Sequence, residues 1–229
     1  DENGKLLSLS IAGEQYSGKA MLDKLDEIAN KAYFLQPCEE KSNCADHLWY
    51  LWSGARSPLY GKDKMAFFER YFLEDKKLHK ENYNAYYHFS EKPEICGKIL
   101  EMFGLDPQRG HIINGHVPVK IKNGESPVKA DGRLFVIDGG ISKAYQKATG
   151  IAGYTLIYDS HSLNLAEHKP FIAGESEHTP EIHMVERLDR RANISDTDKG
   201  MELLLQINDL RDLLDAYRSG DIKEGYKVF

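Results

Sequence analysis

The sequence predicts a mixed α/β fold of the α+β kind, in which helices flank a group of short strands. Two observations support this fold class. Residues 110–171 hold several short β-branched and aromatic runs separated by turns, which is typical of a β-meander. Residues 18–36 and 199–218 carry apolar residues at helical spacing. The chain has 229 residues, of which 41% are hydrophobic, enough for a sizeable core.

The first half of the chain is predicted to be mainly helical. Residues 5–9 follow a Glu-Asn-Gly turn like the second half of a hairpin, so we expect the chain to be a piece of a longer protein. The elements expected next are a helix over 18–36 with Ser17 as N-cap, a polar loop over 37–46, an aromatic run over 47–52, a basic loop over 53–64, a helix over 65–73, a polar run over 74–84, and a helix from Ser90 that has Pro93 in its first turn and Gly104 just beyond its end.

The second half is predicted to be mainly β, with a helix near its end. Its expected elements are strands at 112–113, 134–138, 154–158 and 163–166, a short helix over 142–149, a polar linker over 174–181, an edge strand over 182–185, and the helix over 199–218, capped by Asp196 or Thr197. We therefore divide the chain into residues 1–172, with the meander at 110–171, and residues 173–229, which form a linker, an edge strand and a helix.

Composition excludes several classes of function. The net charge of −6 argues against a nucleic-acid binder, which normally carries a basic surface. No apolar run is long enough to cross a bilayer, so we expect no membrane partner. The three cysteines are odd in number and lack the spacing of a zinc site, which favours a reducing, cytoplasmic compartment.

The stretch from His111 to Val119 predicts a short buried strand that runs into an Asn-Gly-His turn. A histidine at the end of a strand is well placed to ligate a metal, because the strand fixes its backbone while the imidazole faces an open cleft. A second buried run, Leu134 to Gly140, ends in an acid and two glycines, and such neighbouring strand ends often carry sites. The alternative is that His116 only caps the turn by hydrogen bonding, and the residues leave both interpretations open.

Three long motifs carry a resemblance to a known family. They are HIINGHVPVKIKNGESPVKADGRLFVIDGGISKAYQKATGIAGYTLIY (111–158), LWYLWSGARSPLYGKDKMAFFERYF (48–72) and ISDTDKGMELLLQINDLRDLLDAYRSGDI (194–222). Together they resemble class III fructose-1,6-bisphosphatase, a bacterial family in the calcineurin-like metallophosphoesterase superfamily. The resemblance covers essentially the whole chain, but only the C-terminal part of that family's longer chains.

The resemblance implies a β-sandwich flanked by helices, which holds two Mn²⁺ ions and attacks phosphorus with a bridging hydroxide. The implied reaction converts fructose 1,6-bisphosphate to fructose 6-phosphate in gluconeogenesis. Of the family's ligand motifs only the last, Gly115-His116, is present, and Pro118 stands where many superfamily members have a second histidine. His116 would thus be one metal ligand, and one imidazole cannot hold a hard divalent ion against water. We therefore expect the isolated chain to be inactive.

Several other residues are candidates for the same site. The basic loop over 53–64 resembles the segment that carries a phosphate-binding arginine in related phosphatases, although it could equally be a solvated surface loop. Asn114 and Asp138 could orient His116, but Asp138 could equally form a simple Asp-Gly-Gly turn. The candidate contacts to substrate phosphate are Arg56, Lys62, Lys64, Lys129, Arg133 and Lys143.

Two alternatives to a fructose-bisphosphatase stay open. The chain could be a non-catalytic regulatory or oligomerisation module, or a metallophosphatase that acts on another phosphoester. The expected partners are a sugar bisphosphate, further copies of the chain in a homo-oligomer, and a nucleotide or glycolytic-acid effector. The helix over 199–218 is most simply a packing helix and could lie at a subunit interface.

Overall fold

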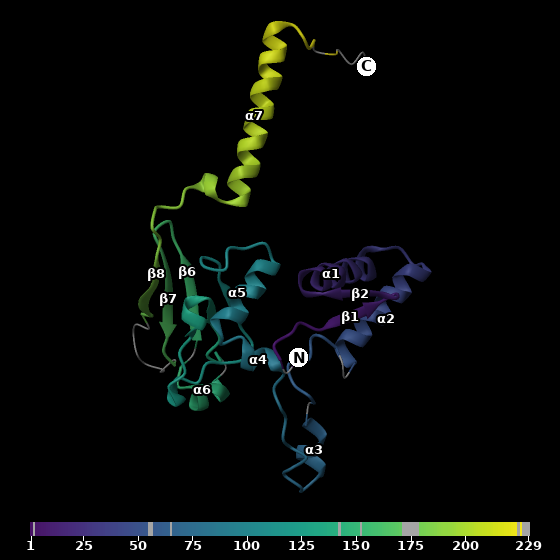
Figure 1. Cartoon of the computed structure of the whole chain (residues 1–229), viewed down its shortest axis with the longest axis vertical. Helices are drawn as coiled ribbons and strands as arrows, with labels where there is room; N and C mark the ends of the chain where they lie inside the picture. The colour runs from purple at the N-terminus through teal and green to yellow at the C-terminus, as the bar shows by residue number, and fades with distance from the viewer. Residues whose placement is uncertain are drawn as a thin grey trace. The chain divides into compact units, whose positions relative to one another are not determined.

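The computed structural model describes residues 1–229 except 2, 55–56, 65, 142, 152, 171–178, 224 and 226–229; the side chains of 143–145 are also outside the description. The chain forms two compact units, Asp1–Ile151 and Ala152–Phe229. The division therefore lies after Ile151 rather than at the expected boundary after residue 172. Figure 1 traces the elements of both units along the chain.

The first unit begins with a hairpin followed by two helices. Strands β1 (Ser8–Ile11) and β2 (Glu14–Ser17) pair antiparallel, so the partner of the first strand follows it in the chain. Ala12 and Gly13 between them both have positive φ, as the type I′ form of a two-residue hairpin turn requires. Helix α1 (Gly18–Phe34) follows as predicted, although the hydroxyl of the predicted cap Ser17 makes no capping bond.

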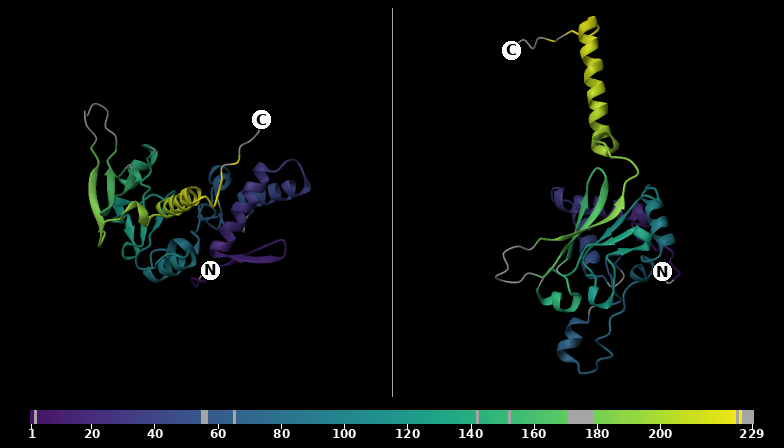
Figure 2. Two further views of the ribbon diagram at one scale, coloured as in Figure 1. Left: turned by 90° about the horizontal axis from the view of Figure 1, so that it is seen from above. Right: turned by 90° about the vertical axis from the view of Figure 1, so that its left-hand side faces the viewer.

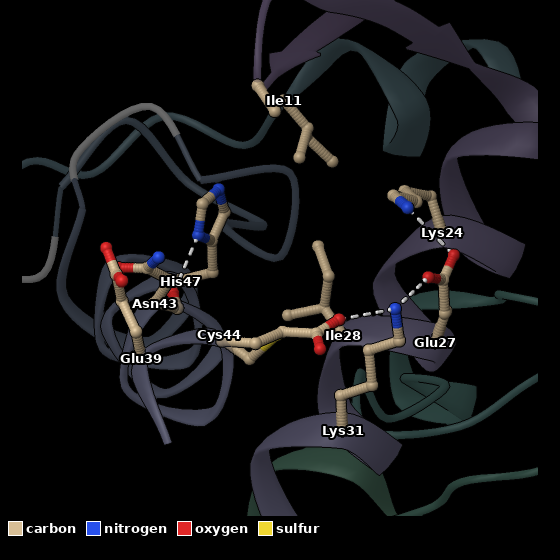
Figure 3. Close-up of a pocket in the computed structure, with 11 residues that line it drawn as sticks. Ile11, Lys24, Glu27, Ile28, Lys31, Glu39, Asn43, Cys44 and His47 are labelled. Atoms are coloured by element: carbon tan, nitrogen blue, oxygen red, sulfur yellow. Dashed lines mark hydrogen bonds and ion pairs between the residues drawn. The ribbon is translucent and has the colours of Figure 1, made fainter.

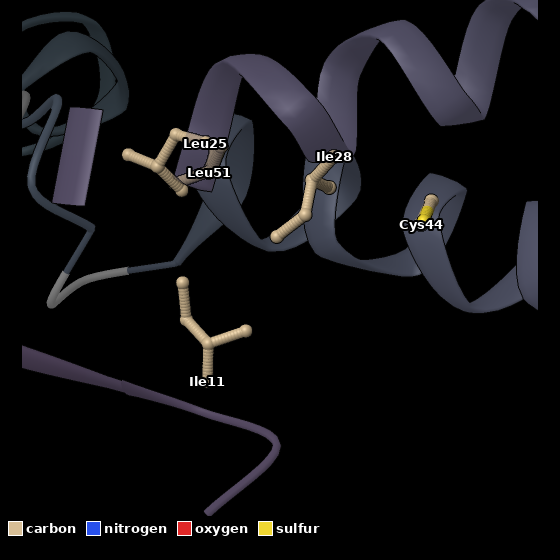
Figure 4. Close-up of a cluster of buried hydrophobic side chains, with 5 residues drawn as sticks. All are labelled: Ile11, Leu25, Ile28, Cys44 and Leu51. Carbon is tan, nitrogen blue, oxygen red and sulfur yellow. The ribbon is translucent and has the colours of Figure 1, made fainter. Parts of the chain in front are cut away.

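Helix α2 (Glu39–Ser53) corrects a prediction, because its first two turns occupy the segment expected to be a polar loop. The Cys38 thiol accepts a hydrogen bond from the Lys41 amide at 3.4 Å and so caps the helix. Lys31 of α1 joins the two helices through its ion pair with Glu40 at 2.8 Å. The hydrophobic cluster that packs the two helices and β1 together (Figure 4) consists of Ile11, Leu25, Ile28, Cys44 and Leu51.

Three shorter helices complete the helical part of this unit. They are α3 (Phe67–Phe72), α4 (Ala85–Phe89) and α5 (Pro93–Met102). Helix α5 begins at Pro93 rather than at the predicted Ser90, which instead follows the end of α4. As predicted, Pro93 lies in the first turn and Gly104 follows the end of the helix, with a φ of 73° that glycine adopts without strain. The segment between residues 61 and 84 is an excursion whose two ends are paired. Lys62 and Tyr83 form an isolated antiparallel β-bridge, and the Asp63 amide donates to the Asn82 carbonyl at 2.9 Å.

The small sheet of the first unit has the strand order β3-β5-β4. Strand β3 (Ile112–Asn114) runs parallel to β5 (Leu134–Val136), and β4 (Val128–Lys129) runs antiparallel to β5. The prediction of one meander over 110–171 is therefore wrong. The connection from β3 to β5 includes η1 (Ile121–Asn123), β4 and η2 (Ala130–Gly132), which is long enough for the crossover that parallel strands need. Helix α6 (Lys143–Thr149) follows.

The second unit contains an antiparallel sheet in the order β6-β7-β8 (Figure 2). Its strands are β6 (Gly153–Tyr158), β7 (Ser162–His168) and β8 (Glu181–Arg187), and the predicted edge strand is confirmed as β8. After η3 (Ile194–Asp196), helix α7 (Asp198–Ser219) confirms the predicted terminal helix. The hydroxyl of Thr197 caps α7 by accepting from the Gly200 amide at 3.0 Å.

The α+β class is confirmed, since the described residues contain both helices and three small sheets. The sandwich implied by the resemblance stays a prediction. None of the described helices is both long and apolar enough to cross a membrane.

Candidate functional site

The turn that carries His116 follows the end of β3 and is fixed at both ends to the chain that follows β5. On one side, the Ile137 amide donates to the Asn114 carbonyl at 2.9 Å. On the other, the Val119 amide donates to the Asp138 carbonyl at 2.7 Å. Two consecutive residues after β5 thus fix the start and the end of the turn. Val119 itself is buried, with 1% of its surface exposed.

Within this turn, His116 has a backbone conformation that is unfavourable for any residue with a side chain. The Val117 amide donates to the Gly115 carbonyl at 2.9 Å, and His116 between them has a φ of 70°. A three-residue turn with positive φ is the rarer and more strained form of γ-turn. Such strain persists only where the surrounding structure enforces it, and it is concentrated at functional sites. The two flanking hydrogen bonds provide that enforcement.

The imidazole of His116 is exposed, and no described residue forms a hydrogen bond or an ion pair with it. It lines a cavity of about 560 Å³. The remaining residues that line this cavity are Leu51, Trp52, Leu59, Tyr60, Gly61, Lys62, Tyr83, Tyr87, Val117 and Pro118. The lining is thus mainly aromatic and aliphatic, and the His116 imidazole, the Lys62 ammonium and the tyrosine hydroxyls can contact a polar ligand.

A second, smaller cavity of about 260 Å³ adjoins the same turn. Asn114 and Gly115 line it, and so does Lys129. It shares Tyr83, Tyr87, Val117 and Pro118 with the larger cavity. The Gly115–Pro118 segment and the two tyrosines therefore contribute to both cavities.

Asn114, two residues before His116, is held by Tyr86 of α4. The Asn114 amide nitrogen donates to the Tyr86 hydroxyl at 2.8 Å, and the hydroxyl lies 3.2 Å from the amide oxygen. Partial burial raises the pKa of Tyr86, so this hydroxyl stays protonated. Asn114 thus supports the turn through its side chain as well as its backbone. The sequence reasoning missed Tyr86, because its partner is far away in the chain.

Lys62 is the predicted phosphate contact that the structure brings to the His116 cavity. Its ammonium lies 2.6 Å from a carboxylate oxygen of Glu81 and 5.4 Å from the ring centre of Tyr83. The hydrogen bond that the Lys62 ammonium donates to Glu81 raises the pKa of Lys62 and lowers the pKa of Glu81. Lys62 therefore stays charged at the cavity wall. Lys64 donates to the Leu78 carbonyl at 2.7 Å and does not line the cavity.

Most of the other predicted site residues have different roles. Lys129 pairs with Glu91 beside the smaller cavity. Arg133 donates to the Pro107 carbonyl and to the side chain of Gln108, both at 2.8 Å, and so ties β5 to the loop after α5. The carboxylate of Asp138 accepts from the Gly140 amide at 2.7 Å, as expected if this residue forms an Asp-Gly-Gly turn. Its backbone carbonyl accepts from Val119 and so fixes the His116 turn. Arg56 and the side chain of Lys143 lie outside the described residues.

A single imidazole does not make a metal centre. In the part of the chain that the structure describes, no group of three or more His, Cys, Asp or Glu side chains could hold a metal ion. The imidazole of His116 is a suitable single donor to a divalent transition metal. The described residues therefore fit one ligand position and not a complete manganese site.

Another cavity, of about 380 Å³, lies between the hairpin, α1 and α2 (Figure 3). Its charged groups are largely paired with one another. Lys24 and Lys31 both bind Glu27, at 2.8 and 2.9 Å, and together they lower the pKa of that carboxyl to about 2. These ion pairs leave little free charge to hold a ligand, so this cavity is a weaker candidate than that beside His116.

Comparisons with known proteins identify the family. The family model of Firmicute fructose-1,6-bisphosphatase matches residues 1–219. A class 3 fructose-1,6-bisphosphatase of Clostridium beijerinckii is 48% identical over 234 residues, which cover 100% of this chain and 35% of the relative. One from Bacteroides fragilis is 52% identical over 231 residues, which cover 98% and 35%. No solved structure matches the chain.

The chain spans about a third of the length of these curated relatives. Its match to the family model nevertheless covers nearly all of the chain, including the His116 turn, the Lys62 excursion and α7. This chain therefore belongs to the Firmicute fructose-1,6-bisphosphatase family.

Proposed function

We propose that this chain is part of a phosphatase that hydrolyses fructose 1,6-bisphosphate to fructose 6-phosphate and phosphate in gluconeogenesis. The observation that carries the proposal is the strained turn at His116, which presents a free imidazole to a cavity that also contains a lysine. The named relatives are fructose-1,6-bisphosphatases, which supports this substrate over other phosphoesters.

Within this proposal, His116 supplies one ligand of a Mn²⁺ site whose other ligands lie outside residues 1–229. A bound divalent ion would supply Lewis acidity and a nucleophilic water. The role of this chain is to hold one imidazole rigidly, because the turn is fixed at both ends and no residue that the structure describes bonds to the imidazole. Residues 1–229 alone would be inactive, since one imidazole cannot retain the ion.

Lys62 would bind a phosphate group of the substrate. Its ammonium lines the same cavity as His116, and its bond to Glu81 keeps it charged and oriented. An ammonium has three donor hydrogens, so it can keep Glu81 and still donate to a phosphoryl oxygen. The tyrosine and tryptophan rings around it would exclude water from the bound sugar phosphate.

We also propose the remaining properties of the whole enzyme, namely a cytoplasmic location, assembly into a homo-oligomer, and control by a nucleotide or a glycolytic acid. They rest on the family resemblance.

A chimeric enzyme tests the proposed activity. In it, residues 1–229 replace the matching third of the Clostridium beijerinckii relative. We expect manganese-dependent phosphate release from fructose 1,6-bisphosphate and much slower release from a phosphopeptide. A chimera that folds but prefers the phosphopeptide, or that releases no phosphate, would contradict the proposal.

The Lys62→Met variant of the chimera tests the phosphate contact. We expect KM for fructose 1,6-bisphosphate to rise by about tenfold with kcat within a few-fold, because a lost ground-state contact weakens binding more than turnover. Lys64→Met is the matched control, since its ammonium lies outside the cavity lining. Equal KM values for the two variants would show that Lys62 does not contact the substrate.

A further inference from the structure

The two cavities beside the His116 turn meet at the turn itself. Gly115 lines only the smaller cavity and His116 only the larger, whereas Val117 and Pro118 line both. The described lining of the larger cavity holds one lysine, Lys62, and no carboxylate. A ligand that reaches across Val117 and Pro118 can therefore contact both cavities at once.

The smaller cavity has cations of its own. Lys120 and Lys129 both line it. Lys129 pairs with Glu91, and its side chain is only 21% exposed. The Lys120 side chain is exposed, and its ammonium bonds to no residue that the structure describes. Because an ammonium has three donor hydrogens, Lys129 can keep its ion pair and, like Lys120, still donate to an anion.

Two glutamates in the same lining restrict the kind of ligand that fits. They are Glu91 and Glu125, and the Glu125 carboxylate accepts from the backbone amide of Lys120 at 3.0 Å. A carboxylate repels a free anion but accepts hydrogen bonds from hydroxyl groups. This mixed lining therefore fits a phosphate that is joined to a sugar better than it fits free phosphate.

The size of the smaller cavity points to one end of a ligand. Its volume of about 260 Å³ lies below the roughly 300–1,000 Å³ of a complete small-molecule site. The larger cavity, at about 560 Å³, lies within that range and contains the proposed metal ligand His116. The phosphate that reacts therefore belongs in the larger cavity, and the smaller one is left for a remote part of the same substrate.

We propose that the smaller cavity binds the second phosphate of the substrate, the one that the reaction does not release. This inference rests on the proposed function, in which the 1-phosphate leaves and the 6-phosphate stays on the sugar. Lys120 and Lys129 bind the 6-phosphate, and the sugar lies across the turn between Tyr83 and Tyr87, which line both cavities. The two lysines thereby give the enzyme its preference for a sugar bisphosphate over a sugar monophosphate.

The contact acts at a distance from the bond that breaks. Binding energy from a remote part of a substrate can be used to orient the reacting group, so its loss lowers kcat/KM. A substrate without the 6-phosphate cannot use this contact. Removal of Lys120 should therefore matter for the bisphosphate and not for fructose 1-phosphate.

The Lys120→Met variant of the chimeric enzyme tests the inference. We expect kcat/KM for fructose 1,6-bisphosphate to fall by about tenfold, while kcat/KM for fructose 1-phosphate stays within a few-fold of the parent. Lys122→Met is the matched control, because its ammonium donates to the Lys147 carbonyl and the residue lines neither cavity. Lys62→Met should lower kcat/KM for both substrates alike, since Lys62 lies beside the reacting phosphate.

Three results would overturn the inference while leaving the phosphatase activity intact. They are equal kcat/KM values for Lys120→Met and Lys122→Met, an equal loss for both substrates in Lys120→Met, and a parent chimera that cleaves fructose 1-phosphate as efficiently as the bisphosphate. A chimera that releases no phosphate from the bisphosphate would instead contradict the proposed function, and this inference with it.

Discussion

The two ends of β3 each carry a histidine, and the structure treats them in opposite ways. His111 precedes the strand; its Nδ1 lies 3.0 Å from the Gly132 carbonyl, and its ring contacts Phe135 with centres 5.2 Å apart. His116 follows the strand with a positive φ and an exposed ring, and no described residue binds its imidazole. The first histidine stabilises the sheet, whereas the second is held in a strained conformation without a stabilising contact of its own.

The contrast shows that a functional side chain can be recognised by the absence of bonds and packing that would stabilise the fold. A histidine that is bonded and packed is explained by the fold alone. His116 instead needs two backbone hydrogen bonds and the Tyr86–Asn114 pair to keep its turn in place, and its ring bonds to none of the residues described. A strained and unpartnered side chain at a cavity is the pattern expected of a ligand-binding residue.

The largest expected effect separates the two histidines by activity. In the chimeric enzyme, His116→Ala should lower kcat/KM by about a hundredfold or more, because it removes the proposed metal ligand. His111→Gln should leave kcat/KM within a few-fold of the parent, since it acts only on the sheet. Steady-state phosphate release measures both. Similar losses of kcat/KM in the two variants would show that the two histidines do not differ in function.

Glycine substitutions should separate the same residues by stability. His111→Gly removes a hydrogen bond and a ring contact and should lower the free energy of unfolding by about 2 kcal/mol. His116→Gly relieves a left-handed strain of about 1–2 kcal/mol against a glycine entropy cost of about 0.5–1 kcal/mol, so stability should be unchanged or slightly higher. Urea unfolding of the 229-residue chain measures both. A large loss in His116→Gly would show a stabilising role that the structure does not reveal.

Tyr86→Phe tests the side-chain support of the turn. The variant keeps the ring and removes the hydroxyl bonded to Asn114, so we expect a loss of about 1 kcal/mol in stability. Activity of the chimera should fall by several-fold through kcat, because the imidazole is less well held. Tyr71→Phe is the control, since that side chain is exposed on α3. Equal effects in both variants would argue against a positioning role for Tyr86.

The smallest effect is a pH dependence of the Lys62–Glu81 pair, whose lysine lines the same cavity as His116. The bond from Lys62 lowers the pKa of Glu81, so this carboxylate stabilises the fold above its unfolded pKa of about 4.3. That contribution disappears as the pH falls through the lowered value. The His116 turn is fixed by backbone bonds and should persist through the same titration. Carbon NMR of the Glu81 carboxyl against the Val119 amide signal would follow both. Simultaneous loss would show that the ion pair and the His116 turn are coupled.

Much of the fold could be predicted from the sequence, because apolar periodicity identifies helices and strands wherever one face is buried. Helix α2 was partly missed, since its first turns are polar and its cap is a cysteine, which is not among the usual capping residues. The parallel pairing of β3 with β5 was also missed. Local sequence does not record which neighbour a short strand takes.

The site was predicted less completely. The Gly-His turn pointed to His116, but its positive φ and the bonds to Ile137 and Asp138 are visible only in three dimensions. Lys62 was one of several basic candidates, and its position beside His116 depends on how the excursion closes at Tyr83. Arg133 was a candidate by charge alone, whereas its bonds show a structural role.

Metal binding tests the central claim most directly, namely that His116 is held free to ligate a metal. The electron paramagnetic resonance signal of free Mn²⁺ measures how many ions the chimeric enzyme binds and how tightly. We expect His116→Ala to weaken the binding of one of two manganese ions by tenfold or more, as loss of a ligand predicts. We expect His111→Gln to bind both ions as tightly as the parent. Unchanged binding of both ions by His116→Ala would contradict the account.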